Sequence, residues 1–543
     1  MSGVQTFQES ATAPASAPPR PQVSPASSLA WVVLALVILG LTGVRLAYLA
    51  TPFSLELSQD EAHYWDWSRH LDWSYYSKGP VVAWLIRLSC VGAGGDTMLA
   101  VRTPAVLCSA FTLLGLAVLT RQVTGRPWLG VLVATLVGTY PVFAAGALLM
   151  TIDAPYLCAW TWALVVAVHL LFHPEPKSAH WITLGLLVGI GILAKYTMVL
   201  FLPGLGLFML VARDQRRRLR QAGPWLMLGT VALCGLPILI WNMQHDWVTV
   251  RHVGGQAGLN TSEFGQTGGW NVLGPLEYLG GQAGLLLGFW FVIFLAALGT
   301  SLGKGLTELR QGTPASFLAL MATTVFGVFL AFSLKTKVQL NWPVAAYLAA
   351  IPLMADWLAV RLDGSARGRA WFLGATVTSV IGLGLTVALH ASTALYPMMH
   401  GWFPDWPVRR WDPTCRLRGW QSLASHVQVL RLSLRADGKE PVLAATAWNL
   451  PGVVAFYLPD QPVVFSLGPA AGQRQSQYEF WPPQPPADPG PFLGQTFIIV
   501  GPVSPQFQAA FEQVEHLPPV TVRVDGHDVA THFLTVARGF RGF

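Results

Sequence analysis

The sequence predicts an α-helical membrane protein that crosses the bilayer about eleven times and carries a small C-terminal α/β domain. Three observations support this fold class. Only 11% of the 543 residues are charged, whereas soluble domains carry about 25%. The mean hydropathy is +0.47, and several apolar segments reach the roughly 20 residues that cross a bilayer. After about residue 390 the composition changes to short β-branched runs between charged and Pro-rich stretches.

The N-terminal residues 1–28 are rich in Ala, Pro and Ser and contain one charged pair, Glu9 and Arg20. Such a segment cannot bury enough apolar surface to fold, so we expect a disordered cytoplasmic tail. The apolar run that follows, from Leu29 to about Ala50, is longer than the core of a signal peptide. It is therefore expected to be an uncleaved membrane anchor.

Eleven apolar segments are predicted to span the membrane. They are approximately 29–50, 98–120, 127–149, 154–172, 181–196, 198–212, 224–241, 275–299, 315–334, 341–358 and 370–390. With a cytoplasmic N-terminus, the loops on the inner side hold most of the Lys and Arg residues, as membrane topology requires. The outer loops hold nearly all the acids of this part of the chain. The net charge of +7 is explained in this way, so the sequence gives no reason to expect a nucleic acid partner.

The first outer loop, about 51–97, contains the densest cluster of acids, bases and aromatic residues. Its stretch from Asp60 to Trp73 is predicted to be a helix, because Ser58 can cap it and acids occupy its first turn. At helical spacing His63 and Tyr64 share a face with Asp60. A second short apolar segment, from Pro80 to Val91, is expected to lie along the membrane surface, where aromatic rings also settle.

The tail beyond the last span, residues 393–543, is predicted to form an outer α/β domain, separate from a membrane domain at 29–392. Helical patterns occupy roughly 418–434 and 505–515. β-branched runs, which favour strands, occur at 442–446, 462–466, 496–500 and 519–524. No sequence in this domain indicates a catalytic group.

The reactive residues gather on the predicted outer side. They are Asp60, Glu61, Lys78, Asp153, His245 and Asp246. Nucleotide sugars and ATP are cytoplasmic, so a transferase acting here needs a donor that has already crossed the membrane, such as a sugar on a polyprenyl phosphate. The chain also lacks a GxGxxG or GxxxxGK[ST] nucleotide loop and a DxD pair.

Asp60 and Glu61 are the candidate catalytic carboxylates. Sugar transfer needs a base for the acceptor hydroxyl and cations for the departing phosphate. Adjacent carboxylates point to different helix faces, so only one is expected to reach the substrate. The alternative is that both simply stabilise the first turn of a helix through its dipole.

Three lysines are candidates for binding the donor phosphate. Lys78 precedes Gly79-Pro80 in a turn, and its alternative role is to reach the lipid headgroups. Lys195 lies between two apolar spans, where an unpaired lysine costs about 2.5–3.5 kcal/mol, although it could be an ordinary charge at a span end. Lys337 belongs to an outer-end group with Asn341.

Seven further residues are expected to contact substrate: His63, Tyr64, Tyr76, Asp153, His245, Asp246 and Asn341. Asp153 could instead cap a helix that begins beside Pro155, and a histidine at an interface, such as His245, is more often structural. Asp60, Glu61 and His63 are suitable metal ligands, but their spacing matches no specific motif. No essential cofactor is therefore predicted, and an optional divalent cation remains open.

Six ordered motifs resemble glycosyltransferase family 39. They are Ser58-Gln59-Asp60-Glu61-Ala62-His63-Tyr64-Trp65, Tyr75-Tyr76-Ser77-Lys78-Gly79-Pro80, Thr151-Ile152-Asp153-Ala154-Pro155, Leu193-Ala194-Lys195-Tyr196-Thr197, Trp241-Asn242 with His245-Asp246-Trp247, and Asn341-Trp342-Pro343. The family groups dolichyl-phosphate-mannose protein mannosyltransferases with bacterial aminoarabinose and galacturonic acid transferases of lipid A. The resemblance covers roughly residues 29–360.

This resemblance implies a GT-C fold with catalysis at the outer face, between the membrane helices and the soluble domain. It implies that Asp60 is the catalytic carboxylate, supported by Glu61, that Lys78 and Lys195 bind the lipid phosphate, and that transfer inverts the anomeric carbon. Aminoarabinose transferases typically have an acid before the loop lysine, whereas this chain has Ser77. A bacterial enzyme for a neutral or uronic acid sugar therefore fits better.

The leading hypothesis is a transferase of the bacterial inner membrane that moves a sugar from a polyprenyl phosphate to a glycolipid such as lipid A or its core. One alternative is an enzyme like the protein O-mannosyltransferases. Another is a transporter of lipid-linked sugars, which predicts charged residues along a path through the membrane and not at one face. A catalytically silent scaffold would give no reason for Asp60, Lys78 and Lys195 to occur together.

Overall fold

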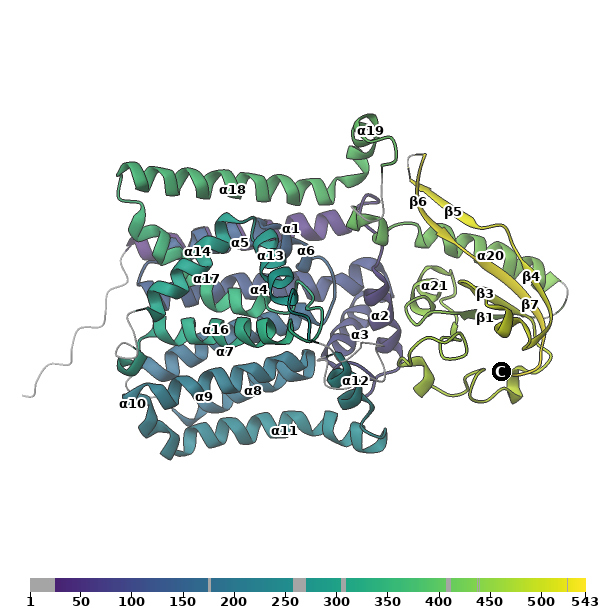
Figure 1. The fold of residues 1–543 in the computed structure, drawn as a ribbon, viewed down its shortest axis with the longest axis horizontal. Helices are drawn as coiled ribbons and strands as arrows, with labels where there is room; N and C mark the ends of the chain where they lie inside the picture. The colour runs from purple at the N-terminus through teal and green to yellow at the C-terminus, as the bar shows by residue number, and fades with distance from the viewer. Residues whose placement is uncertain are drawn as a thin grey trace, which may run out of the picture.

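The computed structural model describes residues 25–173, 177–256, 270–303, 309–406, 412–436, 438, 440–524 and 526–543. These residues form a helix bundle and a C-terminal domain that lie end to end along the long axis of the molecule (Figure 1). Most of the predicted tail 1–28 lies outside the described residues. So do residues 257–269, which belong to the segment between the predicted spans 224–241 and 275–299.

The bundle consists mainly of long apolar helices. The helices of the bundle, long and short, are α1 Pro25–Leu49, α4 Met98–Thr124, α5 Pro127–Thr139, α6 Pro141–Gly146, α7 Asp153–Phe172, α8 Ser178–Ala194, α9 Phe201–Val211, α10 Arg213–Arg216, α11 Ala222–Gln244, α13 Gly274–Leu285, α14 Phe289–Leu302, α16 Pro314–Phe332, α17 Val344–Arg361 and α18 Ala366–His390. Short 3-10 helices occupy Tyr196–Leu200, Arg217–Arg220, Pro413–Leu417, Tyr478–Phe480 and Gly490–Phe492. Each of the eleven predicted spans is largely helical.

Among the described residues, seven helices are long and apolar enough to cross a membrane, or up to nine if each of two bent pairs is one span. The difference from eleven has local causes. The predicted span 127–149 is divided before Pro141, which has no N–H to continue a helix and starts α6. The predicted span 181–196 folds as α8, which has 17 residues. These are the segments for which length alone is ambiguous.

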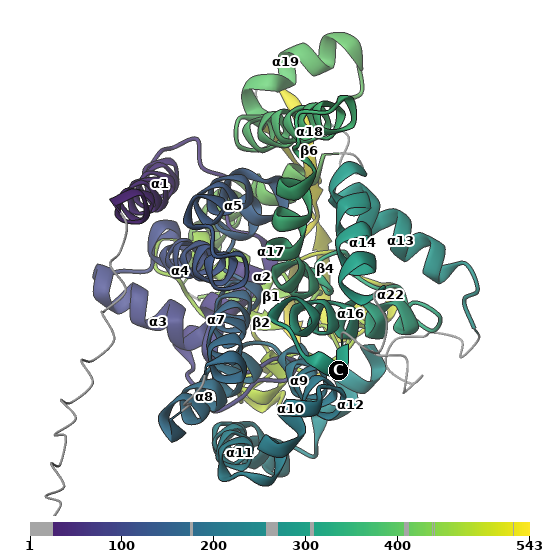
Figure 2. The ribbon, with the colours of Figure 1, turned by 90° about the vertical axis from the view of Figure 1, so that its left-hand side faces the viewer.

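The bundle is layered around central helices. Figure 2, which looks along the bundle, places α17 near the middle and α1, α11 and α18 at the periphery. Burial agrees with this view. In the most apolar 18-residue segment of each helix, 56% of the residues of α17 are buried, against 17% of those of α1 and 11% of those of α18. The peripheral helices expose Leu and Val side chains that a bilayer would cover.

Three short helices lie between the bundle and the C-terminal domain: α2 Gln59–Arg69, α3 Val81–Ala93 and α12 Val248–Gln256 (Figure 1). The start of α2 is the predicted one. The Ser58 hydroxyl accepts a hydrogen bond from the Glu61 N–H (3.2 Å), and the Glu61 carboxylate accepts one from the Ser58 N–H (2.9 Å). This capping box satisfies two N–H groups that a helix start otherwise leaves unpaired. The helix ends at Arg69, four residues before the predicted end at Trp73. The predicted second apolar segment from Pro80 to Val91 is present as the helix α3.

The C-terminal domain contains a mixed sheet covered by helices. Its helices are α19 Ser392–Trp402, α20 Trp420–Ala436, α21 Pro451–Tyr457 and α22 Pro505–Gln508. Its strands are β1 Val442–Ala445, β2 Phe465–Ser466, β3 Phe497–Val500, β4 Phe511–His516, β5 Val520–Val524, β6 His527–His532 and β7 Leu534–Phe540. The sheet order is β2-β1-β3-β7-β4, and β5 and β6 form a separate pair.

Strand direction changes within this sheet. β1 pairs in parallel with β2 and β3, while β7 is antiparallel to β3 and β4. All four predicted strands and the helix at 418–434 are present. The helix predicted at 505–515 is wrong beyond Gln508, because the chain turns there and enters β4, where pairing with β7 overrides the local helical pattern.

Candidate active site

Asp153, Lys195 and Asn341 come from three distant segments and meet at the end of the bundle that faces the C-terminal domain. The Lys195 ammonium lies 2.6 Å from one Asp153 oxygen, and the Asn341 amide donates to the other at 2.8 Å. Asp153 is the first residue of α7, where the helix dipole favours a negative charge. Lys195 is only 7% exposed, so this ion pair provides its counter-charge.

Lys78 is brought beside Lys195 by an unusually close approach of two backbones. A Cβ atom on Gly79 would lie 2.0 Å from the carbonyl oxygen of Leu193, so only glycine fits there. Leu193 precedes Lys195 by two residues. The loop carrying Lys78 is thus packed directly against the end of α8, as the shared outer position of these motifs predicted.

The Lys78 side chain is half-buried. Burial and then the charge of Lys195 lower its pKa to about 8, although Asp60 and Asp153 act in the opposite direction. Within the part of the chain that the structure describes, the Lys78 ammonium forms no ion pair, whereas Lys195 does. Lys78 is therefore the cation of this cluster that is available to an incoming anion.

Asp60 lies in the first turn of α2. It keeps solvent contact, yet protein groups surround it, and this desolvation raises the pKa of its carboxyl above the usual range against the influence of Lys78. A raised pKa makes a carboxylate a stronger base. Asp60 thus combines access with the property that a general base needs.

Glu61 has a different environment from its neighbour. It is fully buried, and its two oxygens accept two hydrogen bonds from Arg102 at 2.8 Å, one from the Met150 N–H at 2.9 Å and one from the Ser58 N–H at 2.9 Å. Burial alone would raise the pKa of Glu61, but Arg102 holds it below the usual range. A carboxylate offers about four acceptor positions, and these hydrogen bonds occupy them, so the geometry gives no support to the catalytic role predicted for Glu61.

His63 and Tyr64 are buried where α2 meets the C-terminal domain. The Trp67 indole N–H donates to His63 Nε2 at 3.1 Å, so Nε2 is the acceptor and Nδ1 carries the proton. Burial, with the charge of Arg474, lowers the pKa of His63 to about 3, so the ring is neutral. Among the described residues Nδ1 has no hydrogen-bond partner. Tyr64 follows Asp60 by one helical turn.

Tyr76 is held from both sides of the domain boundary. Its N–H donates to the Gln477 side chain at 2.6 Å, and its ring lies 4.8 Å from that of His252. The loop that carries Lys78 is consequently fixed by the C-terminal domain as well as by α8.

Three predicted site residues lie outside this cluster. His245 ends α11, where its ring stacks on Trp241 with centroids 3.9 Å apart and its edge faces Phe480. Asp246 and Lys337 are exposed, and within the described ranges neither forms an ion pair. The geometry therefore supports a structural role for His245 and gives no support to the substrate or phosphate contacts predicted for Asp246 and Lys337.

The C-terminal domain contributes a cation that no sequence pattern predicted. The guanidinium of Arg474 lies 4.4 Å from the Trp448 ring centroid. Its charge contributes to the lowered pKa values of His63 and Lys78 and partly offsets the effect of burial that raises the pKa of Asp60. Arg474 stands in a Gly- and Gln-rich loop without any motif, so only the tertiary fold reveals it. Arg102 was also missed, although an arginine inside an apolar segment signals a buried partner.

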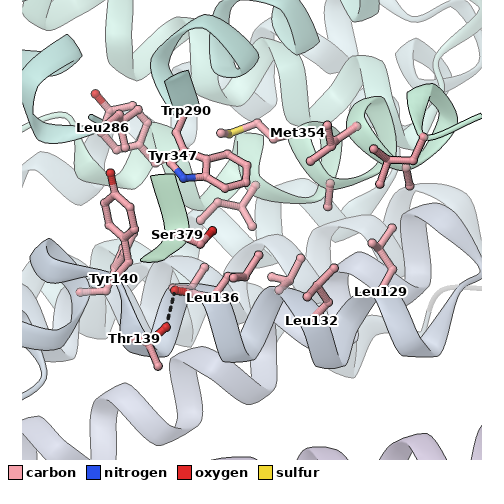
Figure 3. Close-up of a pocket in the computed structure, with 18 residues that line it drawn as sticks. Leu129, Leu132, Leu136, Thr139, Tyr140, Leu286, Trp290, Tyr347, Met354 and Ser379 are labelled. Atoms are coloured by element: carbon pink, nitrogen blue, oxygen red, sulfur yellow. Dashed lines mark hydrogen bonds between the residues drawn. The ribbon is translucent and has the colours of Figure 1, made fainter. Parts of the chain in front are cut away.

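A cavity lies in the bundle, between α5, α14, α17 and α18 (Figure 3). Its volume is about 140 Å³, and none of its lining residues is charged. Leu129, Leu132 and Leu136 form one wall and Tyr347 and Met354 another (Figure 3). The lining of the cavity is apolar apart from the Trp290 indole and the hydroxyls of Thr139, Tyr140, Tyr347 and Ser379. In the described residues, no cluster of His, Cys, Asp or Glu is arranged to hold a metal ion.

Comparisons with known proteins agree with this arrangement. Residues 77–241 match the family described as dolichyl-phosphate-mannose-protein mannosyltransferase. The chain is 30% identical over 326 residues to the lipid A galacturonosyltransferase RgtD of Rhizobium johnstonii. That similarity covers 60% of this chain and 64% of the relative, so it spans a little less than two thirds of the relative's length.

Solved structures extend the comparison to nearly the whole fold. ArnT from Cupriavidus metallidurans matches in its apo state with a TM-score of 0.56, covering 94% of this chain and 98% of that one. The same protein bound to undecaprenyl phosphate matches with a TM-score of 0.58, covering 93% and 98%. Both are 17% identical to this chain, a level that establishes the fold. The chain is therefore a polytopic membrane protein with the GT-C fold, as its sequence motifs predicted, and its sequence is similar to the mannosyltransferase family and to a lipid A galacturonosyltransferase.

Proposed function

We propose that this protein is an inverting glycosyltransferase that moves a sugar from a polyprenyl-phosphate donor to an envelope glycolipid of the lipid A or core type. The observation that carries the proposal is that Asp60, an exposed carboxylate, and Lys78, an ammonium without an ion-pair partner among the described residues, lie near enough for their charges to influence each other. The names of two relatives support the substrate classes: one is a lipid A galacturonosyltransferase and the other was solved with undecaprenyl phosphate.

In this mechanism Asp60 accepts the proton of the acceptor hydroxyl while the oxygen of that hydroxyl bonds to the anomeric carbon. The bond from that carbon to the phosphate oxygen breaks, and the phosphate leaves with the electron pair as polyprenyl phosphate. Lys78 stabilises the charge that develops on the phosphate. Because the base and the leaving group lie on opposite sides of the sugar carbon, the configuration inverts.

The other cluster residues have supporting roles. Glu61 fixes the start of α2 through Arg102, and so fixes Asp60. Asp153 neutralises Lys195 and, with Asn341, is placed to orient sugar hydroxyls. Lys78 is then the main ligand of the phosphate. Lys195, which is paired with Asp153, adds positive charge near the phosphate without binding it directly. His63, Tyr64 and Tyr76 close the side next to the C-terminal domain.

We further propose that the cluster and the C-terminal domain face the periplasm and that the N-terminus is cytoplasmic. The support is the charge distribution, because Arg213, Arg216, Arg217, Arg218 and Arg220 lie around α10, at the end of the bundle opposite the C-terminal domain (Figure 1). Basic residues in short loops mark the cytoplasmic side. At the periplasmic face only lipid-linked sugar donors are at hand.

The test is donor turnover by the full-length protein in lipid nanodiscs. Polyprenyl phosphates carrying different sugars are supplied with lipid A, and release of polyprenyl phosphate is measured. Asp60→Asn is expected to lower kcat by about 10²- to 10⁴-fold, the usual contribution of a general base, with donor affinity retained. Asp528→Asn, in an exposed ion pair of the C-terminal domain, is the control and should stay within about twofold, because an exposed substitution outside the site contributes little. Unchanged turnover in Asp60→Asn would remove Asp60 from the reaction.

A further inference from the structure

A buried polar pair, Gln282 and Tyr347, lies inside the apolar bundle. The Tyr347 hydroxyl in α17 donates a hydrogen bond of 2.5 Å to the side-chain oxygen of Gln282 in α13. Both side chains are only 1% exposed, so neither can satisfy its polar atoms with water. A hydrogen bond of this kind ties two membrane helices together, and Gln282 has a second partner that extends its effect beyond the helices.

The other end of the Gln282 amide reaches the loop before α17. Its nitrogen donates to the Leu340 carbonyl oxygen at 3.3 Å. A carbonyl can only accept, so the amide nitrogen must face Leu340 and the amide oxygen must face the Tyr347 hydroxyl. The Leu340 side chain also lies against α13, because a Cβ on Gly281 would be 2.6 Å from it. Tyr347 thus orients the Gln282 amide, and that amide holds Leu340.

The hydrogen bond on Leu340 acts directly on Asn341. The Leu340 carbonyl and the Asn341 Cα atom belong to one planar peptide unit, so holding that carbonyl restricts the point from which the Asn341 side chain extends. Asn341 itself is exposed, and its amide donates to Asp153 at 2.8 Å. A contact made by an exposed loop residue is therefore held in place from inside the bundle.

We propose that Gln282 and Tyr347 are positioning residues that hold the Asn341 amide on Asp153 during sugar transfer. This inference rests on the proposed function, in which Asp153 and Asn341 orient the sugar hydroxyls. A displacement of about 1 Å at such a contact can lower a rate about 100-fold. Lys78 stands on a separate loop, before α3, so binding of the donor phosphate does not depend on this chain of hydrogen bonds.

The experiment measures kcat and affinity for undecaprenyl phosphate in variants of the full-length protein in nanodiscs. Tyr347→Phe removes only the hydroxyl and should lower kcat about 3- to 10-fold, as expected for one hydrogen bond. Gln282→Ala removes both hydrogen bonds and should lower kcat about 10- to 100-fold. Both variants should keep undecaprenyl phosphate affinity within about twofold.

Tyr278→Phe is the matched control. Tyr278 is another buried tyrosine of the bundle, also in α13, and its hydroxyl donates to the Phe326 carbonyl at 3.2 Å. The substitution removes the same group from a similar environment, but Phe326 lies within α16 and not in the loop that carries Asn341. Thermal stability should therefore fall about as much as in Tyr347→Phe, while kcat stays normal.

A double variant distinguishes positioning of Asn341 from a general effect on packing. If Gln282 acts through Asn341, Gln282→Ala should change kcat by less than about twofold once Asn341→Ala is already present. Independent effects would instead multiply.

Three results would overturn the inference. Equal losses of kcat in Tyr347→Phe and Tyr278→Phe would reduce the pair to ordinary packing, and multiplied effects in the double variant would place the action of Gln282 elsewhere. A wild-type kcat in Asn341→Ala, with Asp60→Asn inactive, would reject this inference and leave the transferase function intact. Absence of polyprenyl phosphate release from every donor would instead reject the transferase function itself, together with this inference.

Discussion

Glu61 and Arg102 form a buried, bidentate ion pair that ties α2 to α4, with both N–O distances at 2.8 Å. Glu61 directly follows Asp60 in the sequence, yet its side chain is buried in the protein interior. In the proposed mechanism, these two adjacent acids therefore have separate tasks: Asp60 takes part in the reaction, and Glu61 holds the start of α2 in position.

Breaking this pair should destabilise the protein strongly. Glu61→Gln or Arg102→Met leaves one charge buried without its partner, which typically costs about 3–5 kcal/mol. The double variant should be less destabilised than the sum of the two single variants, since it removes both charges. Thermal unfolding in detergent measures the effect. The exposed pair Arg523–Asp528 is the control, because such pairs contribute about 0–1 kcal/mol.

Gly79→Ala should abolish donor binding while the bundle stays folded. The added Cβ would collide with the Leu193 carbonyl, so the loop carrying Lys78 must move away from Lys195. Affinity for undecaprenyl phosphate is the measurement. Gly92→Ala, in α3 with no atom within 4 Å of the added Cβ, is the matched control and should bind normally. Equal affinity in both variants would refute the close-packing argument.

Donor affinity should fall as the pH rises through about 8. The Lys78 ammonium has its pKa lowered to about 8 by burial and by Lys195, so in the free protein it is charged below that pH and neutral above it. Affinity for undecaprenyl phosphate should then decrease by at most about tenfold per pH unit above pH 8. Lys78→Arg keeps its charge at all these values and should lose this dependence. A parallel decline in Lys78→Arg would assign the effect to another group.

Gly452→Val should reduce turnover by loosening the C-terminal domain from α2. A Cβ on Gly452 would lie 2.6 Å from the Ala62 carbonyl oxygen, so a bulkier side chain must push α21 away from the helix that carries Asp60. We expect kcat to fall with little change in the thermal stability of the bundle. Gly490→Ala, where the nearest atom is at 3.6 Å, should have normal kcat. A normal kcat in Gly452→Val would show that domain contact is not required for turnover.

Local rules predicted much of the structure. The Ser58 cap, the apolar segments and the strands at 442–446 and 496–500 follow from short-range patterns that the tertiary fold reinforces. Asp153, Lys195 and Asn341 were each expected near a span end, but no sequence pattern predicted that their side chains contact one another.

The remaining features depend on contacts between distant segments. Nothing near Arg474 in the sequence indicates that its loop returns to α2. The strands β6 and β7 depend on pairing that no local pattern encodes. Asp60 and Glu61 differ in environment because Arg102, 41 residues away from Glu61 in the sequence, binds Glu61 and not Asp60. The predicted span 127–149 is divided because Pro141 stops a helix within an apolar run.

The position of Arg474 has a consequence for how such proteins diversify. The groups proposed for bond cleavage are carried by α2 and by the loop before α3, whereas Arg474 is carried by a loop of the C-terminal domain. Exchange of that loop between related proteins would therefore change the electrostatic surroundings of Asp60 and leave the membrane-spanning helices unchanged. Chimaeras that graft the loop would test this separation directly.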